Sequence, residues 1–168
     1  MENRKVTSNI KIEGARLIFR NFQGKGTQYN AEGNRNFGVL LGDDLAEEAA
    51  ADGWNVKYLR PREDDPDQHA QPWLPVKVRY GDYPPIAVLI TSRGKTKLNE
   101  DTIGQLDWTV IKNCDLIIRP YNYPAMQGRP AGVSAYLKSI YITAAEDELA
   151  EKYADVPDAD DSEELPFD

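Results

Sequence analysis

Short runs in which apolar and polar residues alternate dominate this chain of 168 residues. The clearest run covers residues 73–80. Leu74, Val76, Val78 and Tyr80 fall on one parity of this run, and Trp73, Lys77 and Arg79 fall on the other. Successive side chains of a strand point to opposite faces, so this run predicts a strand with one buried face and one cation-bearing face. A chain built from such runs is committed mainly to β structure.

Runs of this kind, rich in Val, Ile and Tyr and separated by turn residues, predict seven strands. They are Asn9–Phe22, Asn36–Leu41, Trp54–Arg60, Trp73–Tyr80, Ile86–Thr91, Asp115–Tyr121 and Val133–Thr143. Many short strands with one or two helices favour a small barrel or sandwich. We expect a five-stranded barrel of the OB type with additional hairpins.

Two short helices and three loops are expected between the strands. Residues 43–53 combine an acidic start, Ala and Glu in the middle and a glycine stop, and residues 99–108 begin with a capping residue followed by acids. The expected loops are Gln23–Gly33, Pro61–Pro72 and Pro124–Gly132. The last of these joins two strong strands, which predicts a long hairpin arm.

Charge divides the chain into two parts. Residues 146–168 contain eleven acidic residues and one lysine, a net charge of −10, while the whole chain carries −8. Residues 1–145 are therefore slightly basic, at +2. A like-charge block repels itself and usually serves as an interaction arm. The sequence predicts a folded domain over residues 1–145 and a disordered, acidic protein-interaction tail over residues 146–168.

The sequence also predicts the compartment. A single cysteine, Cys114, excludes an internal disulfide framework and fits a reducing environment. The first residues lack the apolar stretch of a signal peptide, and no apolar run approaches the ~20 residues that span a bilayer. We expect a soluble, cytoplasmic protein.

Catalytic and metal sites are not predicted. With His69 as the single histidine and one cysteine, the chain offers neither a Ser-His-Asp triad nor a structural zinc set. Gly94-Lys95-Thr96 resembles the end of a phosphate-binding loop, but Leu89 stands where that motif begins with glycine. We expect no cofactor.

Paired carboxylates leave one enzymatic alternative. The pairs are Asp43/Asp44, Asp64/Asp65 and Glu100/Asp101. Such pairs could hold Mg²⁺ for a nuclease, but all of them fall at helix starts or in loops, where capping and solvation explain them. A metal-dependent nuclease is therefore the weakest of the functional alternatives.

Cations interleaved with aromatic residues are the remaining signal. Single-stranded nucleic acid needs a positive track for its phosphates and flat apolar surfaces for its unpaired bases. Aromatic residues also fill cores, and Phe19, Phe37 and Tyr80 are expected there because they share a neighbourhood with aliphatic residues. The predicted nucleic-acid-binding residues are Arg35, Trp54, Lys57, Tyr58, Arg60, Trp73, Lys77, Arg79, Arg93, Lys95, Arg119, Tyr121, Tyr123 and Lys138. The stacking residues among them are chosen by strand parity, so a register error of one residue would reverse each of those choices.

Several stretches carry a resemblance to a known family. They are NIKIEGARLIF, NRNFGVLL, GWNVKYLRPRE, VLITSRGKT, and LDWTVIKNCDLIIRPYNY followed by GVSAYLKSIYIT. Through them the chain resembles the single-stranded DNA-binding proteins encoded by double-stranded-DNA bacteriophages, over most of residues 9–143. Proteins of this kind typically end in an acidic tail with a C-terminal aromatic residue.

The end of this chain fits that pattern with one departure. The residues expected to bind partners are Asp160, Asp161, Glu163, Glu164, Leu165, Pro166 and Phe167. In the bacterial proteins the final phenylalanine carries the terminal carboxylate, whereas here Asp168 follows it. Binding to the pockets that accept the bacterial tail is therefore in doubt, and a phage partner adapted to this ending is an equal alternative.

The resemblance implies an OB-fold body that coats single-stranded DNA without sequence preference in DNA replication, recombination and repair, in the cytoplasm of an infected bacterium. The tail would recruit a polymerase, helicase-primase, recombinase or nuclease, and would compete with DNA for the basic groove. A homodimer formed through residues 124–132 or through the tail stays open. The main alternative is an acidic protein that mimics nucleic acid and inhibits a host enzyme, against which the +2 charge of residues 1–145 argues.

Overall fold

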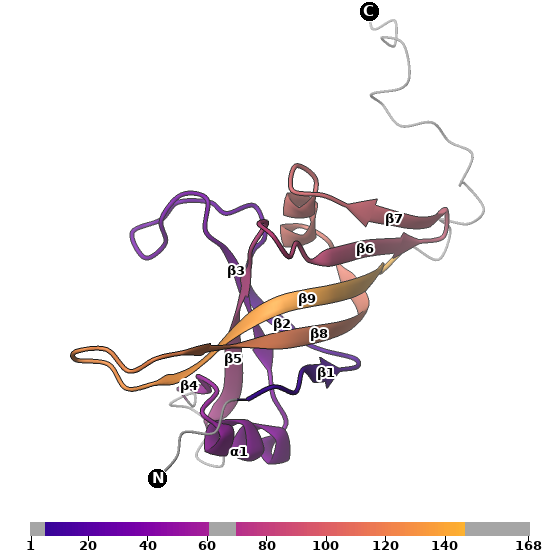
Figure 1. The fold of residues 1–168 in the computed structure, drawn as a ribbon. Coiled ribbons are helices and arrows are strands. Elements are labelled where there is room, and N and C mark those ends of the chain that lie inside the picture. Colours follow the sequence, from indigo (N-terminus) through magenta and orange to yellow (C-terminus); the bar gives the residue numbers. More distant parts are fainter. Residues whose placement is uncertain (1–5, 61–69, 147–168) are drawn as a thin grey trace, which may run out of the picture.

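The computed structural model describes residues 6–60 and 70–146. Within these ranges the chain forms nine strands, one α-helix and one 3₁₀ helix (Figure 1). The strands are β1 (Ile10–Ile12), β2 (Leu17–Asn21), β3 (Arg35–Leu40), β4 (Lys57–Leu59), β5 (Gln71–Val78), β6 (Ile86–Thr91), β7 (Gly94–Leu98), β8 (Ile111–Tyr123) and β9 (Gly132–Ala144). The helices are α1 (Asp43–Asp52) and η1 (Ile103–Asp107). The prediction of a mainly β fold with one or two short helices is confirmed.

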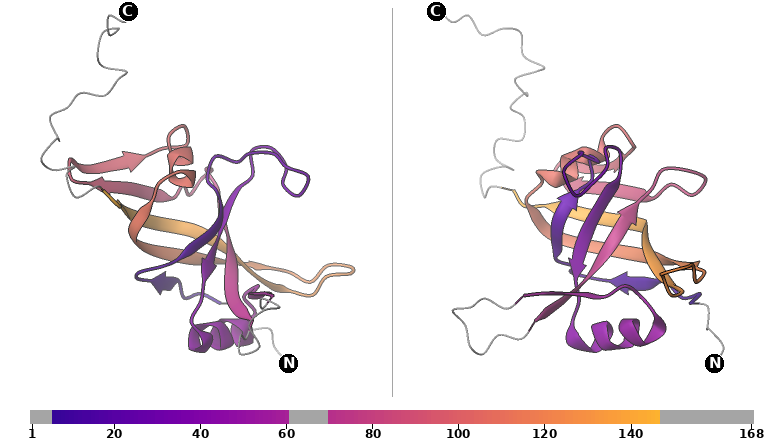
Figure 2. Two further views of the ribbon diagram at one scale, coloured as in Figure 1. Left: turned by 180° about the vertical axis from the view of Figure 1, so that it is seen from behind. Right: turned by 90° about the vertical axis from the view of Figure 1, so that its left-hand side faces the viewer.

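Strand β9 organises the sheet, whose order is β1-β8-β9-β5-β3-β2. On one edge β9 pairs antiparallel with β8 over nearly its full length. On its other edge it pairs in parallel with β5 at Ala135 and Tyr136, and then with β6 from Ser139 to Thr143. Strand β4 pairs with β5, and β7 with β6. The sheet curls around its core, with α1 across one end and the β8–β9 hairpin projecting as an arm (Figure 2).

The core lies inside this curl. Period-two alternation is confirmed on β5, where Leu74, Val76 and Val78 are buried. Phe37 is buried as predicted and stacks on Phe22, with ring centroids 4.9 Å apart. Burial of each of these apolar side chains stabilises the folded state by roughly 1.5–3 kcal/mol. The alternate residues of β5, such as Trp73 and Lys77, therefore lie on the outer face of the sheet.

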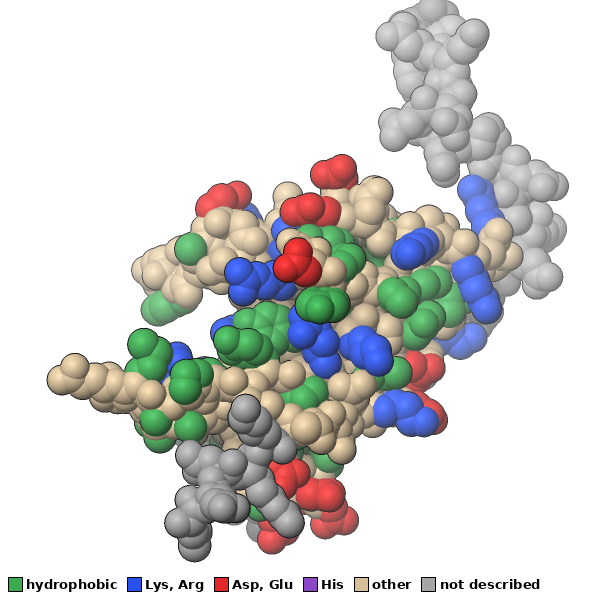
Figure 3. All heavy atoms as spheres, viewed as in Figure 1, with side chains coloured by type: hydrophobic (Ala, Val, Ile, Leu, Met, Phe, Trp, Pro, Cys, Tyr) green, Lys and Arg blue, Asp and Glu red, His purple; other side chains and the backbone are tan. Residues whose placement is uncertain are grey.

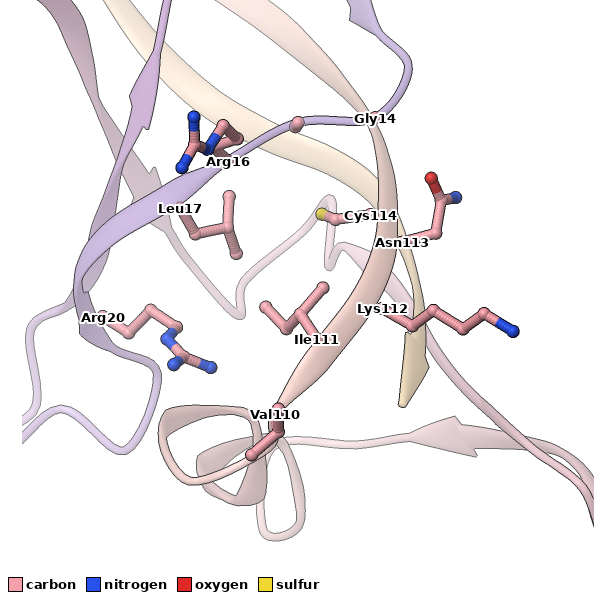
Figure 4. A pocket seen from close by; sticks show the side chains of 10 residues that line it. Gly14, Arg16, Leu17, Arg20, Val110, Ile111, Lys112, Asn113 and Cys114 are labelled. Carbon is pink, nitrogen blue, oxygen red and sulfur yellow. The ribbon is translucent and has the colours of Figure 1, made fainter. Parts of the chain in front are cut away.

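The curled sheet is open on one side, between β2 and β8 (Figure 4). No ladder pairs these two strands in the part of the chain that the structure describes. Instead Arg20 Nη1 donates to the carbonyl oxygens of Leu106 and Thr109, at 2.9 and 2.6 Å. A pocket of about 450 Å³ lies at the opening, and Leu17 and Ile111 are among the residues that line it. The architecture is therefore OB-like, but the barrel is not closed by a continuous ladder.

Several element boundaries differ from the prediction. Residues 9–22 form two strands because Gly14, at φ 64°, turns the chain between them. Strand β7 was not predicted; four of its five residues are exposed, so it shows no apolar alternation. Within residues 99–108 the only helix is the short 3₁₀ helix η1. Just before it, the Asn99 side chain accepts hydrogen bonds from the backbone N–H groups of Asp101 and Thr102. The long hairpin predicted around residues 124–132 is confirmed.

Candidate nucleic-acid interface

A groove of about 620 Å³ lies on the outer face, between the loop that joins β2 and β3 and the surfaces of β5 and β9. Its charged and aromatic lining residues are Arg35, Lys77, Arg79, Tyr80, Glu100 and Tyr136. In the space-filling view, Lys and Arg side chains lie next to hydrophobic ones in a band between that loop and the hairpin arm (Figure 3). Most acidic side chains on this face lie above or below the band. The groove is therefore cationic and partly apolar.

Strand register builds the floor of the groove. Lys77 of β5 is the register partner of Tyr136 of β9, and Tyr136 is the partner of Arg119 of β8. Residues directly opposite each other share a face of the sheet, so the three side chains form one row across three strands. Lys77 Nζ lies 5.8 Å from the centroid of the Tyr136 ring, and the Arg119 guanidinium carbon lies 5.2 Å from it. An aromatic ring flanked by two cations results.

Two further tyrosines extend this row beyond Tyr136. The Arg119 guanidinium carbon lies 5.8 Å from the ring centroid of Tyr83, which is exposed. Tyr121, two residues along β8 from Arg119, packs edge-on against Tyr136 at 5.9 Å and is exposed as well. Cation and aromatic groups therefore continue along β8 toward the arm.

Arg35 is held in one wall of the groove. Its guanidinium pairs with the Glu100 carboxylate at 3.6 Å, and Nη2 donates to the Glu100 carbonyl oxygen at 3.3 Å. The guanidinium carbon also lies 5.6 Å from the Tyr80 ring centroid. Burial raises the pKa of the Tyr80 hydroxyl, while the nearby Arg35 charge lowers it. Glu100 is the one acidic residue among those that line this groove.

A second aromatic cluster lies where β2, β4 and β5 meet. Lys57 Nζ lies 5.8 Å from the centroid of the Trp73 ring, and Phe19 packs edge-on against the same ring at 5.2 Å. Trp73 and Lys77 share the outer face of β5, because they are four residues apart in one strand. The second cluster is thus on the same surface as the groove.

The hairpin arm carries a third pair. The Arg129 guanidinium carbon lies 4.3 Å from the ring centroid of Tyr123. The Tyr123 ring covers Gly132, where a Cβ atom would collide with the tyrosine hydroxyl. The glycine therefore lets the ring lie close to the backbone of the arm.

With this geometry described, comparison with known proteins gives two results. The profile of the phage ssDNA-binding domain family matches residues 1–165. The chain belongs to that family. No curated protein sequence matches it.

Two solved structures of one phage protein are similar to this chain in fold. The single-stranded DNA-binding protein from bacteriophage Enc34, in complex with ssDNA, is 13% identical, with a TM-score of 0.52 over 83% of this chain and 88% of that one. Another structure of the Enc34 protein is 13% identical, with a TM-score of 0.50 over 91% of this chain and 88% of that one. At this identity the likeness concerns the fold of this phage ssDNA-binding domain.

Within the domain, the structure brings part of the predicted site together. Arg35, Lys77 and Arg79 line the groove, and Arg119, Tyr121 and Tyr123 lie along β8 beside it. Lys57, Tyr58 and Trp73 belong to the β4–β5 pair, and Arg60 is exposed just beyond β4. Lys138, also exposed, is on β9. Arg93 and Lys95 lie on the β6–β7 hairpin, which pairs with the opposite half of β9.

Two predictions about individual aromatic residues were wrong. Trp54 is buried, at 5% exposure, because it follows the left-handed Gly53 that ends α1 and bridges to Val133. Its ring faces the core and has no surface for a ligand. Phe19, expected in the core, is 63% exposed. The residues of the predicted partner-binding tail, from Asp160 to Phe167, lie outside the described residues.

Sequence parity missed Tyr83 and Tyr136 as members of the predicted site. Tyr83 lies in the bend between β5 and β6, where strand parity does not apply, whereas Tyr136 lies within β9. The signal that could have found Tyr136 is its position one residue from the buried Ala135 and Leu137. Within residues 6–60 and 70–146, no three His, Cys, Asp or Glu side chains come together as a metal site would need. None of the described helices is long and apolar enough to cross a membrane.

Proposed function

We propose that this chain is a non-catalytic protein that binds single-stranded DNA without sequence preference, with the outer face of β5, β9 and β8 as its binding surface. The observation that carries the proposal is the row Lys77, Tyr136 and Arg119, in which two cations lie beside one half-buried tyrosine ring. Phosphates bind the cations through a salt-dependent release of counterions, and any unpaired base can stack on the ring. Family membership and the ssDNA complex of the Enc34 protein support the same conclusion.

The biological role that fits this chemistry is coating of single-stranded DNA during phage DNA replication and recombination. Sequence-tolerant stacking suits a protein that must cover any exposed strand. The acidic residues 146–168 would bring in replication or recombination proteins through the ending that contains Leu165, Pro166 and Phe167.

The test is a titration of a fluorescent dT oligonucleotide with the full chain at two salt concentrations, read by anisotropy, with matched duplex as competitor. We expect binding that weakens with salt and that duplex competes for poorly. If the full chain binds neither the single strand nor the duplex at low salt, the proposed function is wrong.

Competition between tail and DNA is tested in the same assay with the full-length chain. Asn and Gln at the four positions Asp160, Asp161, Glu163 and Glu164 would remove four negative charges without shortening the tether. If the tail occupies the cationic groove, this variant binds DNA more tightly at low salt, because an attached arm competes at a high effective concentration. Equal affinity would show that the tail does not compete.

A further inference from the structure

The backbone of Phe19 adopts a conformation that a phenylalanine avoids. At φ 51° it is the one non-glycine residue with positive φ among those that the structure describes. The left-handed region is unfavourable for a bulky residue because its Cβ crowds the following carbonyl oxygen. Such a conformation persists only where the surrounding structure enforces it, and it is concentrated at functional sites.

A bulge in the β2–β3 ladder enforces this conformation. The register shifts between Ile18, which pairs with Gly38, and Asn21, which pairs with Asn36. Bulges re-aim side chains, and this one turns Phe19 outward, where 63% of the residue is exposed. Both the strain and the exposed apolar ring are unfavourable for the stability of the isolated domain.

The indole of Trp73, which Phe19 contacts, packs closely over the backbone of Gly38. A Cβ atom at Gly38 would lie 2.7 Å from Trp73 Cε3 and 2.8 Å from Ile18 Cγ1. Only a glycine at this position therefore leaves room for the indole. Phe19 meets the indole edge-on, with an interplanar angle of 67°. The two rings thus form a corner rather than a stack, and Lys57 lies over the indole.

We infer that Phe19 and Trp73 form a second base-binding subsite, in which one unpaired nucleobase stacks in the corner between the two rings while Lys57 binds an adjoining phosphate. This inference rests on the proposed function and extends it from the groove to the β2–β4–β5 junction. Trp73 and Lys77 are four residues apart on β5, which places the subsite about 13 Å from the groove. One strand can therefore contact both.

This subsite also gives a reason for selecting single strands. In a duplex each base is stacked on its neighbours and paired with its partner, so it cannot enter a corner between two protein rings. The duplex offers Lys57 only its phosphates. Loss of the Phe19 ring should therefore weaken binding to the single strand while leaving the weak binding to duplex unchanged.

The test uses full-length variants with the fluorescent dT oligonucleotide and thermal unfolding as paired measurements. Phe19→Leu keeps an apolar side chain and the strained backbone but removes the flat ring, and Phe19→Tyr keeps the ring. We expect Phe19→Leu to weaken binding by about fivefold or more and Phe19→Tyr to bind like the natural protein. Phe19→Gly accepts a positive φ, so it should raise the Tm by about 2–4 °C while it weakens binding.

The outcomes separate this inference from the proposed function. If the natural chain binds the oligonucleotide and Phe19→Leu binds equally well, the subsite does not exist, although the groove still stands. If Phe19→Gly lowers the Tm, the ring stabilises the fold and the argument from strain is overturned. If the natural chain itself does not bind, it is the proposed function that has failed.

Discussion

Two hollows on this domain are both lined by cations, yet they differ in what lies between the cations. In the outer groove, Lys77 and Arg119 flank the ring of Tyr136. The lining of the pocket between β2 and β8 includes Arg16, Lys112 and several aliphatic residues, and Arg20 donates hydrogen bonds to two backbone carbonyls. Figure 4 shows Leu17 and Ile111 pointing into that space without any aromatic ring. Under the proposed function, the outer groove is the candidate site because its cations lie beside an aromatic ring, whereas the residues that line the other pocket include none.

The largest effect should come from the ring at the centre of the groove. We expect Tyr136→Ala to weaken single-strand binding by about 1–3 kcal/mol, because it removes a stacking surface and the group on which two cations lie. Tyr136→Phe keeps the ring and should bind nearly as well as the natural protein. Anisotropy titration measures both, and circular dichroism checks that both fold. If Tyr136→Ala binds as tightly as the natural protein, the ring does not contribute to DNA binding.

A charge reversal in each hollow compares the two directly. Lys77→Glu should weaken binding and reduce the slope of log affinity against log salt by about 0.7, since one phosphate contact is lost. Lys112→Glu makes the same change of charge at the β2–β8 opening and should leave the slope nearly unaltered. Titrations over a series of salt concentrations measure both slopes. If the two variants lose affinity equally, the overall charge of the protein attracts DNA, and the groove is not a specific binding site.

A smaller effect, of opposite sign, is expected at Glu100. Its carboxylate pairs with Arg35 in the wall of the groove, and a DNA phosphate must compete with it for that guanidinium. Glu100→Gln removes the competing charge, so binding should tighten modestly, and more at low salt than at high salt. Asp101→Asn, a change of the exposed neighbouring acid, is the matched control. A weaker complex with Glu100→Gln would mean that the carboxylate positions Arg35 for binding.

The smallest effect is expected at Cys114, which lines the β2–β8 pocket but is buried. Burial raises the pKa of its thiol to about 12, with a further contribution from the neighbouring Asp115 carboxylate. At pH 7–8 the thiol is therefore protonated, and the thiolate that reacts with disulfide reagents is scarce. A thiol assay should detect almost no reaction in the native protein and one thiol in denaturant. Rapid labelling of the native protein would mean that this side opens readily.

How much of this surface the sequence could predict depended on strand regularity. Where a strand is straight, as in β5, alternation correctly placed Trp73 and Lys77 on the outside. Where the backbone departs from regular strand geometry, strand parity no longer predicts which face a side chain occupies. The bulge at Phe19 turns this predicted core residue outward. Trp54 failed for a related reason, because it follows a helix stop rather than lying within a strand. Register across strands, which unites Lys77, Tyr136 and Arg119, depends on long-range pairing that no local pattern contains.

The position of β9 in the sheet also has a consequence for how the protein is made. Residues 132–144 supply the partner for β5, β6 and β8, although all three precede them in the chain. During synthesis on the ribosome these strands must wait with open edges until the last of the described strands emerges. Sheets that depend on such distant pairings fold slowly and expose edges that can associate wrongly. Ribosome-bound chains stalled before residue 132 should therefore be protease-sensitive, and the released chain should be more resistant.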